Sequence, residues 1–151
     1  MQYGLITMFI FIQLMISVVS NDQGNAMRLA ARTAATGDTM IIYRNYATMY
    51  AVANPSYTGT PSNATLAFPS WFVPPSYPSS VQTYIQTGNV YTYYTGPTVG
   101  VPGYLATKLQ NAYEAGINKN GVLVSANLPQ AATATISVPP AVPNGAVVLM
   151  P

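Results

Sequence analysis

The sequence of 151 residues contains neither cysteine nor histidine. Without cysteine the chain has no disulfide bonds and no thiol nucleophile. Without histidine it lacks the general base of a Ser-His-Asp triad, and the two absences together remove the main ligands of transition metals. A disulfide-stapled fold, a transition-metal centre and histidine-based catalysis are therefore excluded.

Charged side chains are scarce as well. They make up 5% of the chain, against about 25% in an average soluble domain. The acidic residues are Asp22, Asp38 and Glu114, and because they lie far apart in the sequence we expect no paired-carboxylate active site. The basic residues form no patch for nucleic acid, and no glycine-rich phosphate loop is present for a nucleotide. We therefore expect a protein that is not an enzyme and that binds no cofactor or metal ion.

Residues 45–107 carry no charge at all. Solubility in this stretch depends on hydroxyl and amide side chains. Such an uncharged surface suits packing into an assembly, and it is also compatible with a small, weakly charged domain that carries no functional signal.

What the sequence does have is a long apolar run at its start. Residues 1–21 carry no charged side chain, and residues 5–19 are almost continuously apolar. At a helix centre such residues favour membrane insertion by about 0.4 kcal/mol each. We therefore expect a transmembrane anchor over residues 1–21, formed by Leu5, Ile6, Phe9, Ile10, Phe11, Ile12, Leu14, Ile16, Val18 and Val19.

Cleavage and orientation of this segment stay open. A secretory signal peptide normally begins with basic residues, whereas the first three residues here have none. A small side chain at Ser20 is nevertheless compatible with cleavage. Arg28 and Arg32 follow the segment, and the positive-inside rule would keep that side in the cytoplasm, whereas a periplasmic C-terminal domain needs the opposite orientation.

A helical stalk is expected over residues 22–54. Its first part, residues 25–35, is rich in strong helix formers. Arg28 and Arg32 are four residues apart and share one face. This pair either contacts anionic lipid or an acidic partner helix, or is simply solvated.

Gly37 predicts a break in the stalk, with Asp38 or Thr39 capping a second helix over residues 39–53. That helix should stop before Asn54-Pro55, because proline disfavours helical geometry in the residue before it. Apolar positions at helical spacing predict a stripe that packs into the core. Its members are Ile42, Tyr46, Met49 and Ala53.

Residues 55–78 are rich in proline, serine, threonine and aromatic residues. Several X-Pro steps exclude a helix or a central strand. Trp71 and Tyr77 could instead form a platform for stacking a sugar. We expect five apolar side chains to pin this loop onto the domain: Leu66, Phe68, Trp71, Phe72 and Val73.

The rest of the chain predicts a small α+β domain. Residues 81–86 and 90–95 have strand character and are joined by a turn at 87–89. Helical spacing over residues 104–115 ends at Gly116, and Asn120-Gly121 introduces the next strand. Further strands are predicted at residues 122–125, 133–138 and 146–150.

The predicted fold class is therefore α+β with a pilin-like overall layout. A transmembrane helix over residues 1–21 continues into the stalk over residues 22–54. A periplasmic domain over residues 55–151 then contains a small, mostly antiparallel sheet and one further helix.

Four segments resemble the PilM family of type IVB and thin-pilus systems, including those of conjugative plasmids. They are NPSYTGT (54–60), GNVYTYY (88–94), AGINKNGVLVS (115–125) and VPPAVPNGAVVLM (138–150). The resemblance covers nearly the whole chain, and its motifs are structural rather than catalytic. It implies an inner-membrane protein of the pilus basal body or pilin transport apparatus.

We therefore expect a membrane-anchored structural component of a type IV pilus assembly apparatus. It would cross the bacterial inner membrane once and contact pilin or other pilus assembly proteins, with homo-oligomer formation left open. One alternative is a minor pilin-like subunit in the fibre, although pilins carry an early acidic residue that this chain lacks. A less favoured alternative is a secreted carbohydrate-binding module.

Candidate interaction residues follow from residue type. Aromatic and arginine side chains often anchor protein interfaces, although core packing would explain the aromatic residues equally well. The candidates are Arg28, Arg32, Tyr46, Trp71 and Tyr93.

Overall fold

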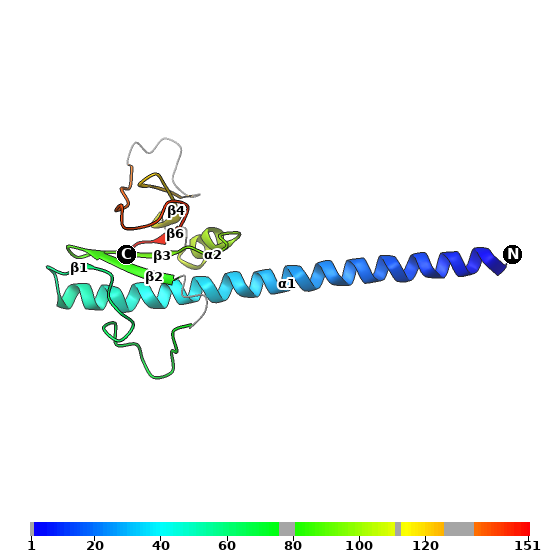
Figure 1. Cartoon of the computed structure of the whole chain (residues 1–151), viewed down its shortest axis with the longest axis horizontal. Coiled ribbons are helices and arrows are strands. Elements are labelled where there is room, and N and C mark those ends of the chain that lie inside the picture. Colours follow the sequence, from blue (N-terminus) through cyan, green and yellow to red (C-terminus); the bar gives the residue numbers. More distant parts are fainter. Residues whose placement is uncertain (1, 76–80, 111–112, 126–134) are drawn as a thin grey trace. The chain divides into compact units, whose positions relative to one another are not determined.

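The computed structural model describes the backbone of residues 2–75, 81–110, 113–125 and 135–151, and the side chains in these ranges from residue 23 onward. Within these ranges the helices are α1 (Gln2–Ala53) and α2 (Val101–Lys108). The strands form one antiparallel sheet in the order β1-β2-β3-β6-β4-β5 (Figure 1). Their bounds are β1 (Thr58–Gly59), β2 (Val81–Gln86), β3 (Asn89–Tyr94), β4 (Ala115–Lys119), β5 (Val122–Val124) and β6 (Val147–Leu149).

The chain forms two compact units, Met1–Arg32 and Thr33–Pro151. The first unit is the N-terminal part of α1, in which the side chains of residues 25–32 are exposed. The second unit contains the remainder of α1, helix α2 and the sheet. It holds the hydrophobic core.

No helix in the described part of the chain is both long enough and apolar enough to cross a membrane. This finding overturns the predicted transmembrane helix over residues 1–21, and with it the fold class as stated and the localisation as a single-pass inner-membrane protein. From residue 23 onward, where its side chains are described, α1 carries Arg28, Arg32, Asp38 and Arg44 and is not apolar enough for a membrane-spanning segment. The side chains named as the anchor, from Leu5 to Val19, lie outside the described ones.

Helix α1 runs without interruption through Gly37, so the predicted break there is wrong. Gly37 is buried, and a Cβ at this position would overlap the ring of Tyr104 in α2. Thr39 does not cap a new helix, because its Oγ1 donates to the carbonyl of Ala35 at 2.8 Å. The glycine therefore permits a close approach of the two helices. The predicted end at Ala53, before Asn54-Pro55, is confirmed.

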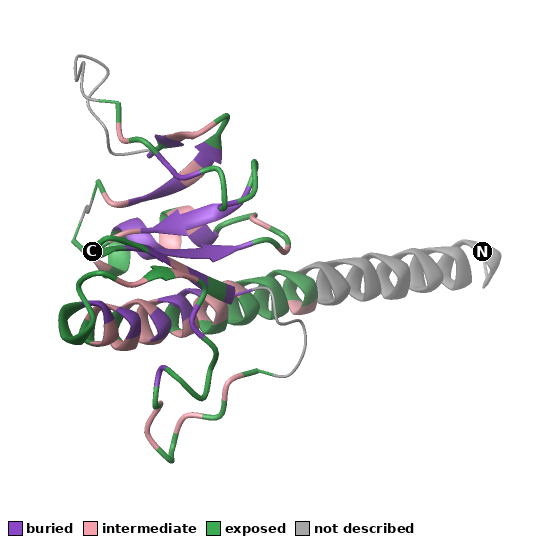
Figure 2. Ribbon diagram, turned by 60° about the vertical axis from the view of Figure 1, so that its left-hand side comes forward, coloured by how far each residue is buried: buried purple, intermediate pink, exposed green. Residues whose placement is uncertain are grey.

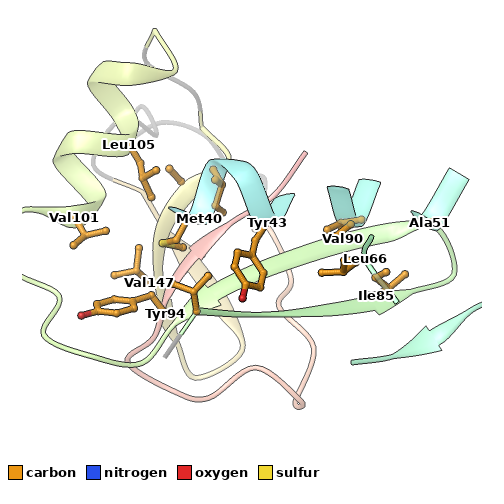
Figure 3. Close-up of a cluster of buried hydrophobic side chains, with 14 residues drawn as sticks. Met40, Tyr43, Ala51, Leu66, Ile85, Val90, Tyr94, Val101, Leu105 and Val147 are labelled. Carbon is orange, nitrogen blue, oxygen red and sulfur yellow. The ribbon is translucent and has the colours of Figure 1, made fainter. Parts of the chain in front are cut away.

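The core of the second unit lies between α1 and one face of the sheet (Figure 3). Helix α1 contributes Met40, Tyr43, Ala47 and Ala51, which recur every three to four residues. The stripe that faces the core therefore differs from the predicted stripe and lies on another side of the helix. Met49, a member of the predicted stripe, is 66% exposed. Both stripes have helical spacing, and packing decides which one faces the sheet. The facing side chains are Val81, Ile85, Val90, Tyr94, Val147 and Leu149 from the sheet, and Val101 and Leu105 from α2.

A second cluster covers the opposite face of the sheet. Tyr91 and Tyr93 of β3 and Val148 of β6 pack there against Leu123 of β5 and against the segment that leads into β6. Strand β6 is therefore buried on both faces, which explains its uninterrupted apolar sequence. The partners are Leu123, Val138, Val142 and Ala146.

The strand predictions hold best where the signal is local. The β2–β3 hairpin agrees with its predicted strands to within one residue, and its turn has positive φ at Thr87 (45°) and Gly88 (84°). Strands β5 and β6 lie within the predicted strands at residues 122–125 and 146–150. Of the strand predicted at residues 133–138, the first two residues lie outside the described ones, and the remainder forms a single bridge between Ser137 and Val122.

The predicted helix over residues 104–115 is wrong at the described residues 109–110 and 113–115, which are not helical. Helix α2 ends at Lys108, and Gly116 lies inside β4 rather than at a helix end. A Cβ on Gly116 would lie 2.5 Å from the carbonyl oxygen of Val124, so this glycine allows β4 and β5 to approach closely. Long-range pairing with β5 and β6 thus overrides the helical spacing of the sequence.

Candidate interaction surface

A loop over residues 61–75 lies on the side of α1 away from the sheet (Figures 1 and 2). Phe68 packs against Tyr43 and Tyr46 of α1, with ring centroids 4.8 and 5.4 Å apart. Phe72 packs on Phe68 at 5.0 Å. Leu66 is only 3% exposed and joins the core. These contacts confirm that Leu66, Phe68 and Phe72 pin the loop onto the domain.

Hydrogen bonds order the same loop, which we call the Trp71 loop (residues 61–75). The hydroxyl of Tyr43 donates to Asn63 Oδ1 at 3.0 Å. Ser62 Oγ accepts the backbone N–H of Thr65 at 3.2 Å, and the N–H of Phe72 donates to the carbonyl of Pro69 at 2.9 Å. Prolines at positions 61, 69, 74 and 75 further restrict the backbone. The loop is therefore held in one conformation without regular secondary structure.

Two large apolar side chains of the Trp71 loop are left in solvent. Trp71 is 71% exposed and Val73 is 81% exposed, so the prediction that these two residues pin the loop is wrong. The Trp71 indole packs on the edge of Phe72 with centroids 6.1 Å apart. Because the loop that carries Trp71 is already fixed by packing, its backbone would lose little conformational entropy on binding.

Helix α1 adds a second exposed apolar region. Met49 and Val52 are 66% and 77% exposed. Met49 lies one turn after Tyr46, which packs on Phe68 of the loop. Since residues 45–107 carry no charge, this region and the Trp71 loop offer an uncharged surface.

The five sequence-predicted interaction residues fall into different environments. Trp71 is exposed, and Tyr46 is half-buried and linked to it through Phe68 and Phe72. Arg28 and Arg32 are exposed and belong to the first unit. The fifth candidate, Tyr93, lies in β3 of the sheet.

Tyr93 is 5% exposed, and its hydroxyl donates to Gln82 Oε1 at 2.7 Å. Burial raises the pKa of the Tyr93 hydroxyl. Tyr93 is therefore a core residue of the sheet. Met49, Val52 and Val73 were missed as surface candidates, because exposure depends on packing that residue type alone does not reveal.

Two charged groups of the second unit, Asp38 of α1 and Lys108 of α2, form an ion pair at the surface between the two helices. Tyr104 donates its hydroxyl hydrogen to Asp38 Oδ1 at 2.8 Å, and Lys108 Nζ lies 3.6 Å from the same oxygen. Contact with Tyr104 and the charge of Asp38 raise the pKa of Lys108. The described residues contain no group of three or more acidic side chains that could hold a metal ion. Tyr77, the second member of the predicted sugar platform, lies outside them.

Comparison with known proteins identifies relatives by family and by fold. A family model described as PilM matches residues 7–150. A crystal structure of a PilM protein from Escherichia coli B7A has a TM-score of 0.57 and 18% identity, and the match covers 82% of this chain and 94% of that chain. A pilM protein from Pseudomonas aeruginosa 2192 gives a TM-score of 0.47 and 27% identity over 78% and 93%. No curated protein matches the chain. The Escherichia coli protein shares the fold.

Proposed function

The chain belongs to the PilM family of pilus-related proteins, and we propose that it is a non-catalytic structural component of a pilus assembly apparatus that binds another pilus protein through the Trp71 loop. Involvement in pilus assembly follows from the family. The place in a basal body or in pilin transport, and the link to conjugative pili, remain predictions. The observation that carries the proposed binding role is the exposed Trp71 on a loop that is otherwise packed.

A role without catalysis agrees with the chemistry of the sequence. The chain has no histidine or cysteine, and its three acidic residues are widely separated. The ion pair between Asp38 and Lys108 is an exposed contact between the two helices and has no catalytic partner among the described residues. The unusual feature of the surface is instead the exposure of large apolar side chains such as Trp71 and Val73.

The partner should present an apolar, uncharged surface. Trp71 and Val73 expose large apolar side chains within a charge-free stretch of 63 consecutive residues, 45–107. An interface of this kind gains its free energy from apolar burial, which is insensitive to moderate salt, whereas charged interfaces weaken as salt is added. Arg28 and Arg32 are solvated in this proposal, and neutralising them should leave binding unchanged.

The test replaces Trp71 in cells that assemble the pilus. Trp71→Ala should leave stability within about 0.5 kcal/mol, because the side chain is exposed, and should reduce both piliation and recovery of partner complexes. Val99→Ser is the matched control. Val99 is 67% exposed, and its carbonyl contacts Thr33, which lies about 15 Å along α1 from Tyr43.

A photo-crosslinking amino acid at position 71, with position 99 as the control, identifies the partner. A crosslink to a pilus protein that persists as salt is raised supports the proposal. Normal piliation by a stable Trp71→Ala protein, or an equal crosslink at position 99, would contradict it. Recovery of the protein in sheared, purified pili would point to a fibre subunit instead.

A further inference from the structure

The chain contains two Asn-Gly steps, and both lie in turns of the second unit. Asn120-Gly121 joins β4 to β5, with φ of 53° at Asn120 and 82° at Gly121. Two central residues with positive φ are typical of a type I′ hairpin turn. Asn144-Gly145 precedes β6, and Gly145 has a φ of 81°. Neither step belongs to the Trp71 loop.

An Asn-Gly step is prone to deamidation, because glycine has no Cβ to shield its backbone nitrogen. That nitrogen loses its proton and attacks Cγ of the preceding asparagine. A carbon–nitrogen bond forms within the chain, the bond to the side-chain nitrogen breaks, and ammonia leaves. Water then opens the resulting succinimide to aspartate or isoaspartate. The sum is one water consumed and one ammonia released, with no oxidant or reductant.

Buried Asn118 engages the backbone nitrogens of both glycines. Its Oδ1 accepts the N–H of Gly121 at 2.9 Å, and its carbonyl oxygen accepts the N–H of Gly145 at 2.8 Å. Its Nδ2 donates to the carbonyls of Val142 and Pro143 at 2.9 and 3.1 Å. With 2% exposure and every side-chain donor and acceptor engaged, Asn118 is held in a single orientation.

The two turns are also joined directly. Asn144 Oδ1 accepts the backbone N–H of Asn120 at 2.9 Å. The side-chain carboxamide of Asn144, which would react at the second step, is therefore hydrogen-bonded to the backbone of the first step. The backbone N–H of Asn118 donates to the carbonyl of Ala146 at 2.9 Å, which closes the same network at the start of β6.

We propose that Asn120 and Asn144 are conditional deamidation sites and that Asn118 controls the reactivity of both. Each glycine nitrogen must give up its proton and turn toward its own asparagine side chain before it can react. In the native fold both protons point instead at oxygens of Asn118. The reaction therefore needs local opening of this corner of the sheet.

Deamidation at either step would alter the protein. Each event lowers the formal net charge of +2 by one. Isoaspartate at position 120 would add a methylene group to the backbone of a two-residue turn, which fixes the register between β4 and β5. Damage at this corner would therefore reach the strand that pairs with β6.

The test incubates the purified full chain in mildly alkaline buffer, with and without urea. Peptide mapping by mass spectrometry then measures isoaspartate at positions 120 and 144. Both sites should react at least about tenfold more slowly in the native protein, since only the opened fraction is reactive. Asn118→Ala removes the acceptor of the Gly121 N–H and the Nδ2 bonds to Val142 and Pro143, but it keeps the backbone carbonyl that accepts from Gly145. It should therefore accelerate position 120 without urea, and position 144 to a smaller extent. Asn89, which is followed by Val90, is the internal control and should not change.

Hydrogen exchange of the Gly121 and Gly145 amides supplies a second measurement that needs no variant. Both amides should be protected, and conditions that speed their exchange should speed deamidation in proportion. The proposal is overturned if the native chain deamidates as fast as the unfolded chain, or if a folded Asn118→Ala protein shows no acceleration at either site. If Asn118→Ala does not fold, the urea comparison and the exchange rates decide.

Discussion

Gly37 lies in the middle of α1, where a glycine normally lowers helix stability by about 1 kcal/mol relative to alanine. Packing offsets this loss of helix stability, because only a residue without a Cβ leaves room for the ring of Tyr104. A Cβ would lie 2.6 Å from Cε1 of that ring. Tyr104 in turn donates to Asp38, the next residue of the helix. The missing side chain therefore provides the space in which α2 docks.

We predict that Gly37→Ala lowers the free energy of unfolding by about 1–3 kcal/mol, since overpacking outweighs the gain in helix propensity. Gly24→Ala is the control, because a Cβ added to that glycine would have no atom within 4 Å and should cause no such loss. Urea unfolding followed by circular dichroism measures both. A stabilised Gly37→Ala protein would show that Tyr104 can move aside at little cost.

Aromatic residues show how far residue type alone can be read. Tyr46, Trp71 and Tyr93 were equivalent candidates in the sequence. The structure leaves Trp71 exposed and Tyr46 half-buried, and buries Tyr93. Each outcome depends on which distant segment covers the side chain, and neighbouring residues in the sequence do not carry that information.

At the scale of elements, β6 has the largest structural role for its length. Its three residues pair with β3 on one side and with β4 on the other. All three side chains are fully buried. The strand itself was predictable from its apolar sequence, whereas its place between two earlier strands was not, because strand order depends on long-range pairing.

Deletion of residues 147–151 should abolish cooperative folding of the second unit. Each fully buried side chain of β6 contributes about 1.5–3 kcal/mol, and their sum is comparable to the stability of a typical domain, roughly 5–15 kcal/mol. Thermal unfolding by circular dichroism should lose its sigmoidal transition. Deletion of Pro151 alone, an exposed residue, should leave the transition intact. A cooperative transition in the longer deletion would mean that β3 and β4 fold without β6.

At the scale of the whole molecule, the resolved pKa shifts all point the same way. Burial raises the pKa of Tyr43 and that of Tyr93. The contact with Tyr104 and then Asp38 raise that of Lys108. Each raised pKa means that the folded state favours the protonated form. The associated stability is present below the unfolded pKa and lost as pH rises through the folded one.

We therefore predict that stability falls on the alkaline side, beginning near the ordinary tyrosine pKa of 10.0. Between about pH 6 and 8 it should stay level, because the chain has no histidine. Urea unfolding across this range measures the profile, and Tyr43→Phe should reduce the alkaline slope. A large loss of stability between about pH 6 and 8 would contradict this assignment, since histidine is the side chain that ordinarily titrates there.

The sequence by itself determined what local chemistry controls. Pro55 ends α1 because it restricts the residue before it, and the β2–β3 hairpin follows from alternating residues on either side of a short turn. The absence of cysteine and histidine needs no structure to be interpreted. The family resemblance, carried by turn and strand motifs, is confirmed by the match over residues 7–150.

Only the tertiary structure decided the features that depend on distant partners. It selected the core-facing stripe of α1, kept that helix unbroken at Gly37, and placed Gly116 in a strand. It also left Trp71 exposed on a packed loop, and it corrected the transmembrane prediction. The α1 stripe, Gly37, Gly116 and Trp71 share one physical reason. Helical spacing, glycine content and apolar character set which surfaces a segment can bury, and the segments that pack against it determine which surface is buried.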